Sequence, residues 1–226
     1  MPSQADVEFL RRGLNRLSGR AKADLLALWA QLPVGDVAAM RQALEVVWPE
    51  LVASYGELAG TVGADVFEAW AEEQGVRPRV EMVRPVDADR ANARMRWAIG
   101  QPDALGCLTV ILDELVKQVA RSTIGRSAGA SRMRFARVPA GHETCAFCIM
   151  LGSRGAVYWS AEKAGKMRKY HGDCDCQAIA CRGPEDYPDG YDPDALYDRY
   201  QAARSAAGSG DPTSILAQMR SQDDIH

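Results

Sequence analysis

The sequence lacks a long uninterrupted apolar run. No stretch approaches the roughly 20 consecutive apolar residues that a membrane span needs. Asp6, Glu8 and Arg11 also occupy the place where a secretory signal carries its apolar core. We therefore expect a protein that folds in a cytoplasm and has no membrane partner.

The chain is also poor in histidine and in net charge. Its 226 residues include three histidines and carry a formal net charge of −3, which argues against a dedicated nucleic-acid binder. Six cysteines are present, yet disulfides are rare in a reducing compartment, and a chain that is 47% hydrophobic can bury a core without them. The cysteines therefore favour metal binding.

Hydrophobic spacing predicts helices in the first part of the chain. Apolar residues recur at helical intervals over 7–17, behind a possible Ser3 cap, and again over 22–32. Asp36 is placed to cap a third helix, and Pro49 suits the first turn of a fourth.

Glycine and proline then predict a break before two more helices. Residues 75–85 contain Gly75, Pro78 and Pro85, which favour an extended segment. A helical pattern follows over 87–100, and Asp103 is placed to cap a strongly apolar helix that reaches at least Val119. The fold class we expect is mainly α.

Composition divides the chain into three parts. Residues 1–136 are expected to form a helical docking domain, and residues 137–182 a small, loop-rich α+β module. Residues 183–226 are expected to be an acidic linker, a short helix over about 193–207 and a mobile tail. Two β-prone pieces fall in the middle part, at 155–160 and 176–181.

The middle part carries a cluster of metal-binding residue types. Structural zinc takes four Cys or His ligands, commonly with one C-x2-C pair whose turn directs backbone N–H groups at the sulfurs. The five candidate ligands are Cys145, Cys148, His171, Cys174 and Cys176. Since five residues compete for four places, one is spare, and Cys174 or Cys176 is the first to leave out. We expect a structural Zn²⁺ site.

Two other interpretations of the cysteines stay open at this point. Some could be ordinary buried cysteines, or form disulfides in a particle exposed to oxidising surroundings; Cys107 suits a core position, and Cys181 could pair with a spare thiol. A catalytic centre is the less favoured alternative. His142-Glu143 lies just before the C-x2-C pair and leaves no room for the separate helices of the deaminase pattern. A thiol nucleophile at Cys148, with His142 or His171 as its base, would not need the other cysteines. No enzyme activity and no small-molecule substrate are expected.

A basic stretch lies between Leu115 and His142, where Asp and Glu are absent. It could contact an acidic protein or a DNA backbone, or its charges could pair with the acidic C-terminal part. The candidate binding residues are Lys117, Arg121, Arg126, Arg132, Arg134 and Arg137.

Three motifs give the sequence a resemblance to a known family. The runs `RVPAGHETCAFCIMLGSRGAVY`, `YHGDCDC` and `GYDPDALYDRY`, together with the helical half, resemble the minor capsid proteins of actinobacterial tailed phages and prophages, of the Mu F-like head morphogenesis type. The resemblance covers most of the chain.

The resemblance implies a structural role in the phage head. Such proteins are present in few copies and associate with the portal and procapsid during assembly in the host cytoplasm. The partners implied are the portal protein, a scaffold or the major capsid protein, and the location is the procapsid or virion head. The alternative function is a zinc-containing protein that contacts packaged DNA through residues 117–137.

Overall fold

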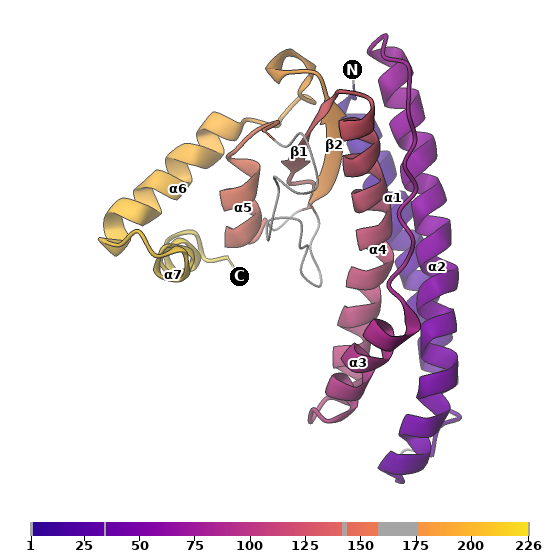
Figure 1. Cartoon of the computed structure of the whole chain (residues 1–226). Coiled ribbons are helices and arrows are strands. Elements are labelled where there is room, and N and C mark those ends of the chain that lie inside the picture. The colour runs from indigo at the N-terminus through magenta and orange to yellow at the C-terminus, as the bar shows by residue number, and fades with distance from the viewer. Residues whose placement is uncertain (1, 34, 142–143, 158–175, 226) are drawn as a thin grey trace.

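The computed structural model describes residues 2–33, 35–141, 144–157 and 176–225. This part of the chain is mainly helical, as the sequence predicted, with one small sheet. None of its helices has the length and apolar character that crossing a membrane requires. The bundle helices are α1 (Gln4–Trp29), α2 (Val37–Glu73), α3 (Ala88–Ile99) and α4 (Ala104–Ala130). In Figure 1, α1, α2 and α4 run alongside one another, and α3 lies against them near one end.

Helix α1 is one element where the sequence predicted two. Its start is the predicted one, because Ser3 and Asp6 form a reciprocal capping box. The apparent gap at Ser18 is a buried helical position whose hydroxyl donates to Asp113 Oδ1 at 2.6 Å. Because Ser18 is polar, the apolar pattern of the sequence stops there although the helix continues.

Helix α2 is also continuous, and the predicted break at Pro49 is wrong. Asp36 caps the helix as expected. Proline has no N–H to donate to the carbonyl four residues earlier, which would normally break the helix. Here that carbonyl, of Glu45, accepts from Asn92 Nδ2 at 3.1 Å. A side chain from α3 therefore supplies the hydrogen bond that Pro49 lacks.

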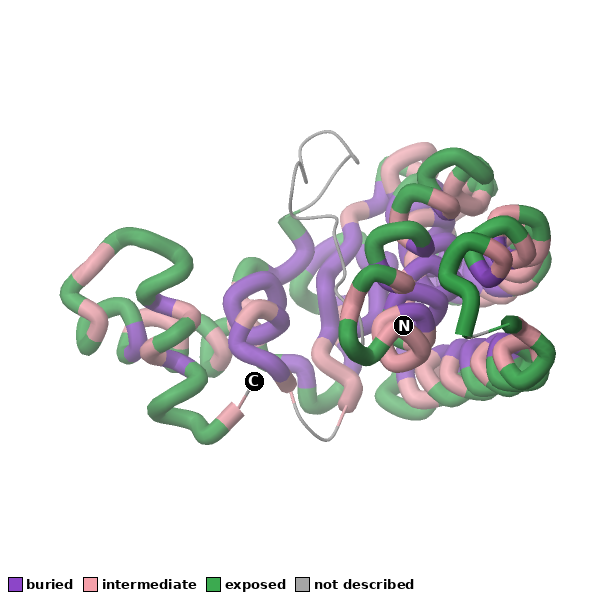
Figure 2. Tube along the Cα trace, turned by 90° about the horizontal axis from the view of Figure 1, so that it is seen from below, coloured by how far each residue is buried: buried purple, intermediate pink, exposed green. Residues whose placement is uncertain are grey.

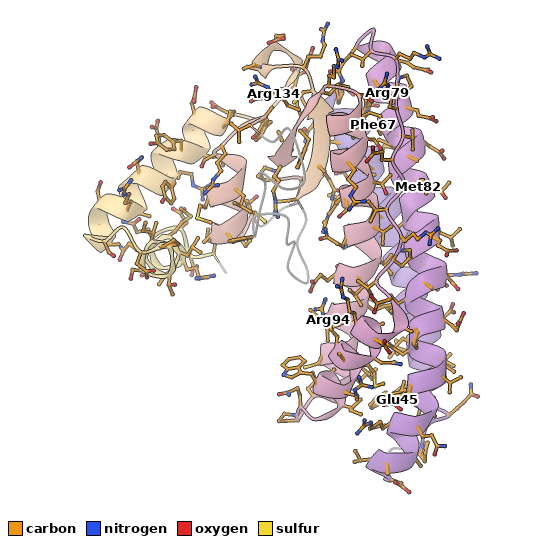
Figure 3. All side chains as sticks on the ribbon, in the orientation of Figure 1. Glu45, Phe67, Arg79, Met82, Arg94 and Arg134 are labelled. Atoms are coloured by element: carbon orange, nitrogen blue, oxygen red, sulfur yellow. The ribbon has the colours of Figure 1, made fainter. Side chains whose placement is uncertain are left out.

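The extended segment predicted between α2 and α3 is confirmed, and we call residues 76–87 the strap. The strap runs along α4 and is anchored by alternate backbone N–H groups. Those of Arg79, Glu81 and Val83 donate to hydroxyl oxygens on α4 and on its C-cap at 2.8, 2.9 and 3.1 Å. The three acceptors recur every four residues: the C-cap Ser131, then Ser127 and Thr123 within α4. Figure 3 labels Arg79 and Met82 along this path.

Helix α4 is the centre of the core and is buried on nearly every side. It contacts α1, α2, α3 and both strands. Helix α2 approaches α4 closely at Gly63, where an added Cβ would lie 2.7 Å from the Ala120 carbonyl oxygen. Figure 2 shows the buried residues gathered along the inside of the bundle and the sheet.

The sheet joins β1 (Arg134–Val138) to β2 (Gln177–Cys181) in antiparallel register, with Arg137 opposite Ala178. Strand β2 was predicted, but β1 was not, and the expected boundary between residues 136 and 137 falls inside β1. Residues of both strands belong to the same hydrophobic core as the helices. Of the β-prone piece 155–160, residues 155–157 are not strand and the rest lies outside the described residues.

Three helices lie beside the sheet, away from the bundle: α5 (Ala146–Gly152), α6 (Pro193–Ala207) and α7 (Pro212–Asp223). A 3-10 turn (Pro184–Asp186) precedes α6. The predicted short helix is confirmed as α6, whereas α7, in the part expected to be a mobile tail, was not predicted. Asp211 caps that helix, and Ile215 and Met219 are buried against α5 and α6. Two apolar residues one turn apart did not suffice to predict this helix, because a Gly/Ser sequence directly precedes it.

Candidate metal centre

Three of the five candidate ligands lie together. Cys145, Cys148 and Cys176 form one buried cluster, with exposed fractions of 8%, 2% and 1%, and Phe147 packs against it. Cys148 lies in α5, Cys145 is the N-cap of that helix, and Cys176 directly precedes β2. The fold therefore joins the C-x2-C pair to a thiol from a distant part of the sequence.

The C-x2-C pair has the support that the sequence predicted. The backbone N–H of Cys148 donates to Cys145 Sγ at 3.3 Å. Cys145 is also the N-cap of α5, so the turn that starts this helix is the turn that aims the N–H at the sulfur. Hydrogen bonds of this kind stabilise the negative charge that a thiolate carries when it binds a metal.

The donor set is chemically suited to zinc. Thiolate sulfur is a ligand that zinc prefers, and a closed structural zinc site takes four Cys or His ligands. His171 and Cys174, which would complete the site, lie outside the described residues, as does His142. Within the described ranges, no group of three or more Cys, His, Asp or Glu side chains is arranged to hold a metal ion.

The two remaining cysteines are separate from this cluster. Cys181 is fully buried in the main core at the far end of β2, opposite Arg134. Burial, and next the nearby Asp186 carboxylate, raises the pKa of its thiol to about 12. A thiol that resists ionisation is a poor metal ligand and a poor nucleophile. Cys107 is half-buried against the main core, as its position in the sequence suggested.

A pair of tyrosines that the sequence did not single out holds the end of α5. Tyr191 Oη donates to the Gly152 carbonyl oxygen at 2.5 Å, and the Ala156 N–H donates to Tyr187 Oη at 2.7 Å. The two rings meet edge to face, with centroids 5.0 Å apart. The segment before α6 thus anchors the helix that carries Cys145 and Cys148. In the sequence, two tyrosines within a turn-rich acidic run could have indicated this anchor.

The six basic residues of the stretch do not share one exposed surface. Lys117, Arg121 and Arg137 are buried, with 6%, 2% and 1% of their surfaces exposed. Arg134 is half-buried, and only Arg126 and Arg132 are exposed. The six side chains therefore cannot contact a DNA backbone together. Helix α4 is central, so residues on several of its sides are covered.

Lys117 has its partner within α4 itself, not in the acidic C-terminal part. Its Nζ lies 2.9 Å from Asp113 Oδ1, and that oxygen also lies 3.3 Å from Lys22 Nζ of α1. The same oxygen accepts from Ser18, as described above. This buried network joins α1 to α4, and it accounts for one of the charges that the sequence assigned to a binding surface.

The architecture is a helical bundle with a two-stranded sheet, and α5, α6 and α7 lie beside that sheet. Residues 1–203 match the VG15 protein family, and the chain belongs to that family. It is similar to the Gene 15 protein of Mycobacterium phage L5, with 27% identity over 213 residues, which covers 71% of this chain and 72% of the relative. Both likenesses indicate a phage protein. No solved structure matches the chain.

Proposed function

We propose that this protein is a non-catalytic structural component of a tailed-phage head, a minor capsid protein that docks on the portal or procapsid and contains a structural zinc site. Membership of the VG15 family and the similarity to a phage protein support a phage role. The head role itself follows from the motifs around the cysteines, which resemble those of minor capsid proteins.

The observation that carries the metal part of the proposal is the convergence of Cys145, Cys148 and Cys176 in one buried cluster. When bound, zinc would supply folding free energy that links α5 to the start of β2. Cys145, Cys148 and Cys176 would supply three of its thiolate ligands. A closed set of four ligands leaves no open position for a substrate, which favours a structural role over catalysis.

Quantitative mass spectrometry of purified procapsids and virions tests the head role. We expect the chain in procapsids at a small, fixed ratio to the major capsid protein. A Cys148→Ser variant should fold less stably and enter particles poorly, whereas Cys107→Ser, which alters a half-buried thiol outside the cluster, should enter normally. Wild-type chain that is abundant in the lysate but missing from every particle would contradict the proposal.

A further inference from the structure

Helix α7 contacts its neighbours through one stripe of its surface. Ile215 and Met219, four residues apart, are 0% and 1% exposed, and both pack in one cluster with residues of α5 and α6. Four residues further on, Asp223 Oδ2 lies 2.8 Å from the guanidinium of Arg199 on α6. Residues four apart lie on the same side of a helix. One stripe therefore holds both buried residues of α7 and its ion pair.

The surface beneath α7 is an apolar face that α5 and α6 share. Its members on α6 recur at intervals of three or four residues, so they lie on one side of that helix. We call these residues the α5–α6 face: Ala146, Ile149, Leu196, Tyr200, Ala203 and Ala207. Figure 1 shows α5, α6 and α7 together, apart from the bundle. Without α7 the face would be an exposed apolar patch, and such patches mark protein-binding surfaces.

The attachment of α7 to this face is slight. A helix of 12 residues has little stability of its own in water. Gly208, Ser209 and Gly210 precede it, and Gly208 has a φ of 58°, which favours glycine. Within the described residues, the pair of Arg199 and Asp223 is the one polar link from α7 to another element, and it is partly exposed and so contributes little. Release of α7 would therefore break few contacts.

The α5–α6 face and the helix that covers it differ in their relation to the family. The match to the VG15 family ends at residue 203. The matched range contains α5 and most of α6, and so all of the face except Ala207, whereas α7 lies beyond it. This difference favours a role for the face other than holding α7.

We propose that the α5–α6 face is a docking site for an amphipathic helix of a partner protein, and that α7 covers it until that helix displaces α7. The partner helix would share the pattern of the α7 stripe, with two aliphatic side chains four residues apart and a carboxylate, four residues further on, that pairs with Arg199. A ligand shifts an equilibrium only by a difference in affinity. The α7 of a second copy would make the same contacts as the chain's own α7, so a different helix with larger apolar side chains is the better competitor. Neither the zinc site nor the head role is needed for this exchange.

A labelled synthetic peptide of residues 209–225 is the probe, and fluorescence anisotropy measures its binding to the full-length chain. In the wild type the attached α7 competes at an effective concentration on the order of millimolar. Met219→Asp places a charge on the buried side of α7 and leaves the face unaltered, so this variant should bind the peptide at least about tenfold more tightly than wild type. Ala217→Asp is the matched control, because Ala217 is exposed on the same helix, and it should bind the peptide as wild type does.

The ion pair supplies a second test of the same surface. A peptide that carries Asp223→Arg should bind the Met219→Asp chain less tightly, and adding Arg199→Asp to that chain should restore its affinity, because the pair is re-formed with the charges exchanged. Loss without restoration would overturn the predicted pairing of the partner helix with Arg199.

Equal peptide affinity in wild type and in a folded Met219→Asp chain would overturn the proposal. If that variant does not fold, hydrogen exchange of the wild type decides. Amides of α7 should exchange at least about tenfold faster than those of α6, because α7 opens alone; equal rates would mean that the two helices open together and would overturn it. A wild-type dimer in light scattering that Met219→Asp abolishes would assign the face to a second copy and overturn the claim of a partner protein.

Discussion

The Sγ atom of Cys145 accepts a hydrogen bond from the backbone N–H of Cys148 at 3.3 Å, and this contact is also the cap of α5. The first two candidate ligands are therefore positioned by local helix formation. Cys176, in contrast, depends on the pairing of β2 with β1 to reach them. A metal bound to all three would link the stability of α5 to the pairing of β2 with β1.

Metal removal should loosen the C-terminal helices before the bundle. One side of α5 carries the cysteines, and Ala146 and Ile149 pack against α6 and α7. Because α5 has only seven residues, it has little stability of its own. After treatment with a chelator under reducing conditions, hydrogen exchange should rise over α5, α6 and α7. Exchange in α1, α2 and α4 should stay within error, and an equal increase across the chain would contradict this coupling.

Substitution of Gly63 should separate α2 from α4. A Cβ there would lie 2.7 Å from the Ala120 carbonyl oxygen and 2.9 Å from its Cα, and backbone atoms cannot turn aside as a flexible side chain does. Gly63→Ala should lower the free energy of unfolding by about 2 kcal/mol, as overpacked cores do. Gly13→Ala is the control, because nothing lies within 4 Å of that position in α1. It should stabilise the protein by up to about 1 kcal/mol in urea unfolding, and a Gly63 variant as stable as wild type would refute the close approach.

The sequence was informative wherever the relevant partner was close along the chain. The caps at Ser3, Asp36 and Asp103, and the extent of α6, were all predicted, because each depends on residues within one turn. The hydrogen-bonded C-x2-C turn was predicted for the same reason.

The predictions that were wrong depend on partners from distant segments. Pro49 did not start a separate helix because Asn92 donates to the carbonyl that proline leaves without a partner. The helix predicted over 7–17 continues through Ser18, whose hydroxyl donates a hydrogen bond to Asp113. Arg137 looked like a surface charge, since nothing nearby in the sequence shows that α5 folds over β1. No local pattern encodes these contacts.

Loss of the Asp113 charge should be strongly destabilising. Asp113→Asn would leave Lys117, which is 6% exposed, without its carboxylate partner. Breaking a buried pair from one side costs about 3 kcal/mol or more. The neighbouring Glu114→Gln is the matched control, since it breaks the partly exposed pair with Arg94 and should cost about 1 kcal/mol or less. Similar losses of unfolding free energy in the two variants would refute the buried network.

The same carboxylate gives stability a defined dependence on pH. Burial by itself would raise the pKa of Asp113, but Lys117, Ser18 and Lys22 outweigh it and hold the pKa below the ordinary value of 3.8. A depressed carboxyl pKa adds stability that is complete above the unfolded value and is lost as the pH falls through the folded value. The difference in unfolding free energy between wild type and Asp113→Asn should therefore be constant from pH 5 to 7 and become smaller below about pH 4. A difference in unfolding free energy that grows as the pH falls would contradict this assignment.

The strap depends on hydroxyl groups that it does not itself carry. Ser127, which is fully buried, accepts the backbone N–H of Glu81. Ser127→Ala would leave that N–H without its acceptor, at a cost of about 1–3 kcal/mol, and should raise hydrogen exchange at residues 79–83. Ser122→Ala removes a partly exposed hydroxyl that accepts from Gln118 on the same helix, and should change stability by less than about 0.5 kcal/mol. Unchanged exchange in the strap of the Ser127 variant would count against this anchor.

The central claim is that the cysteine cluster is a structural zinc site, and the most direct test is metal analysis of the full-length protein purified under reducing conditions without added zinc. Mass spectrometry of the elements should find about one zinc per chain. Cys145→Ser and Cys176→Ser should each reduce that ratio well below one, while Cys107→Ser should leave it unchanged. A wild-type protein with its full helical content and roughly zero zinc per chain would contradict the account.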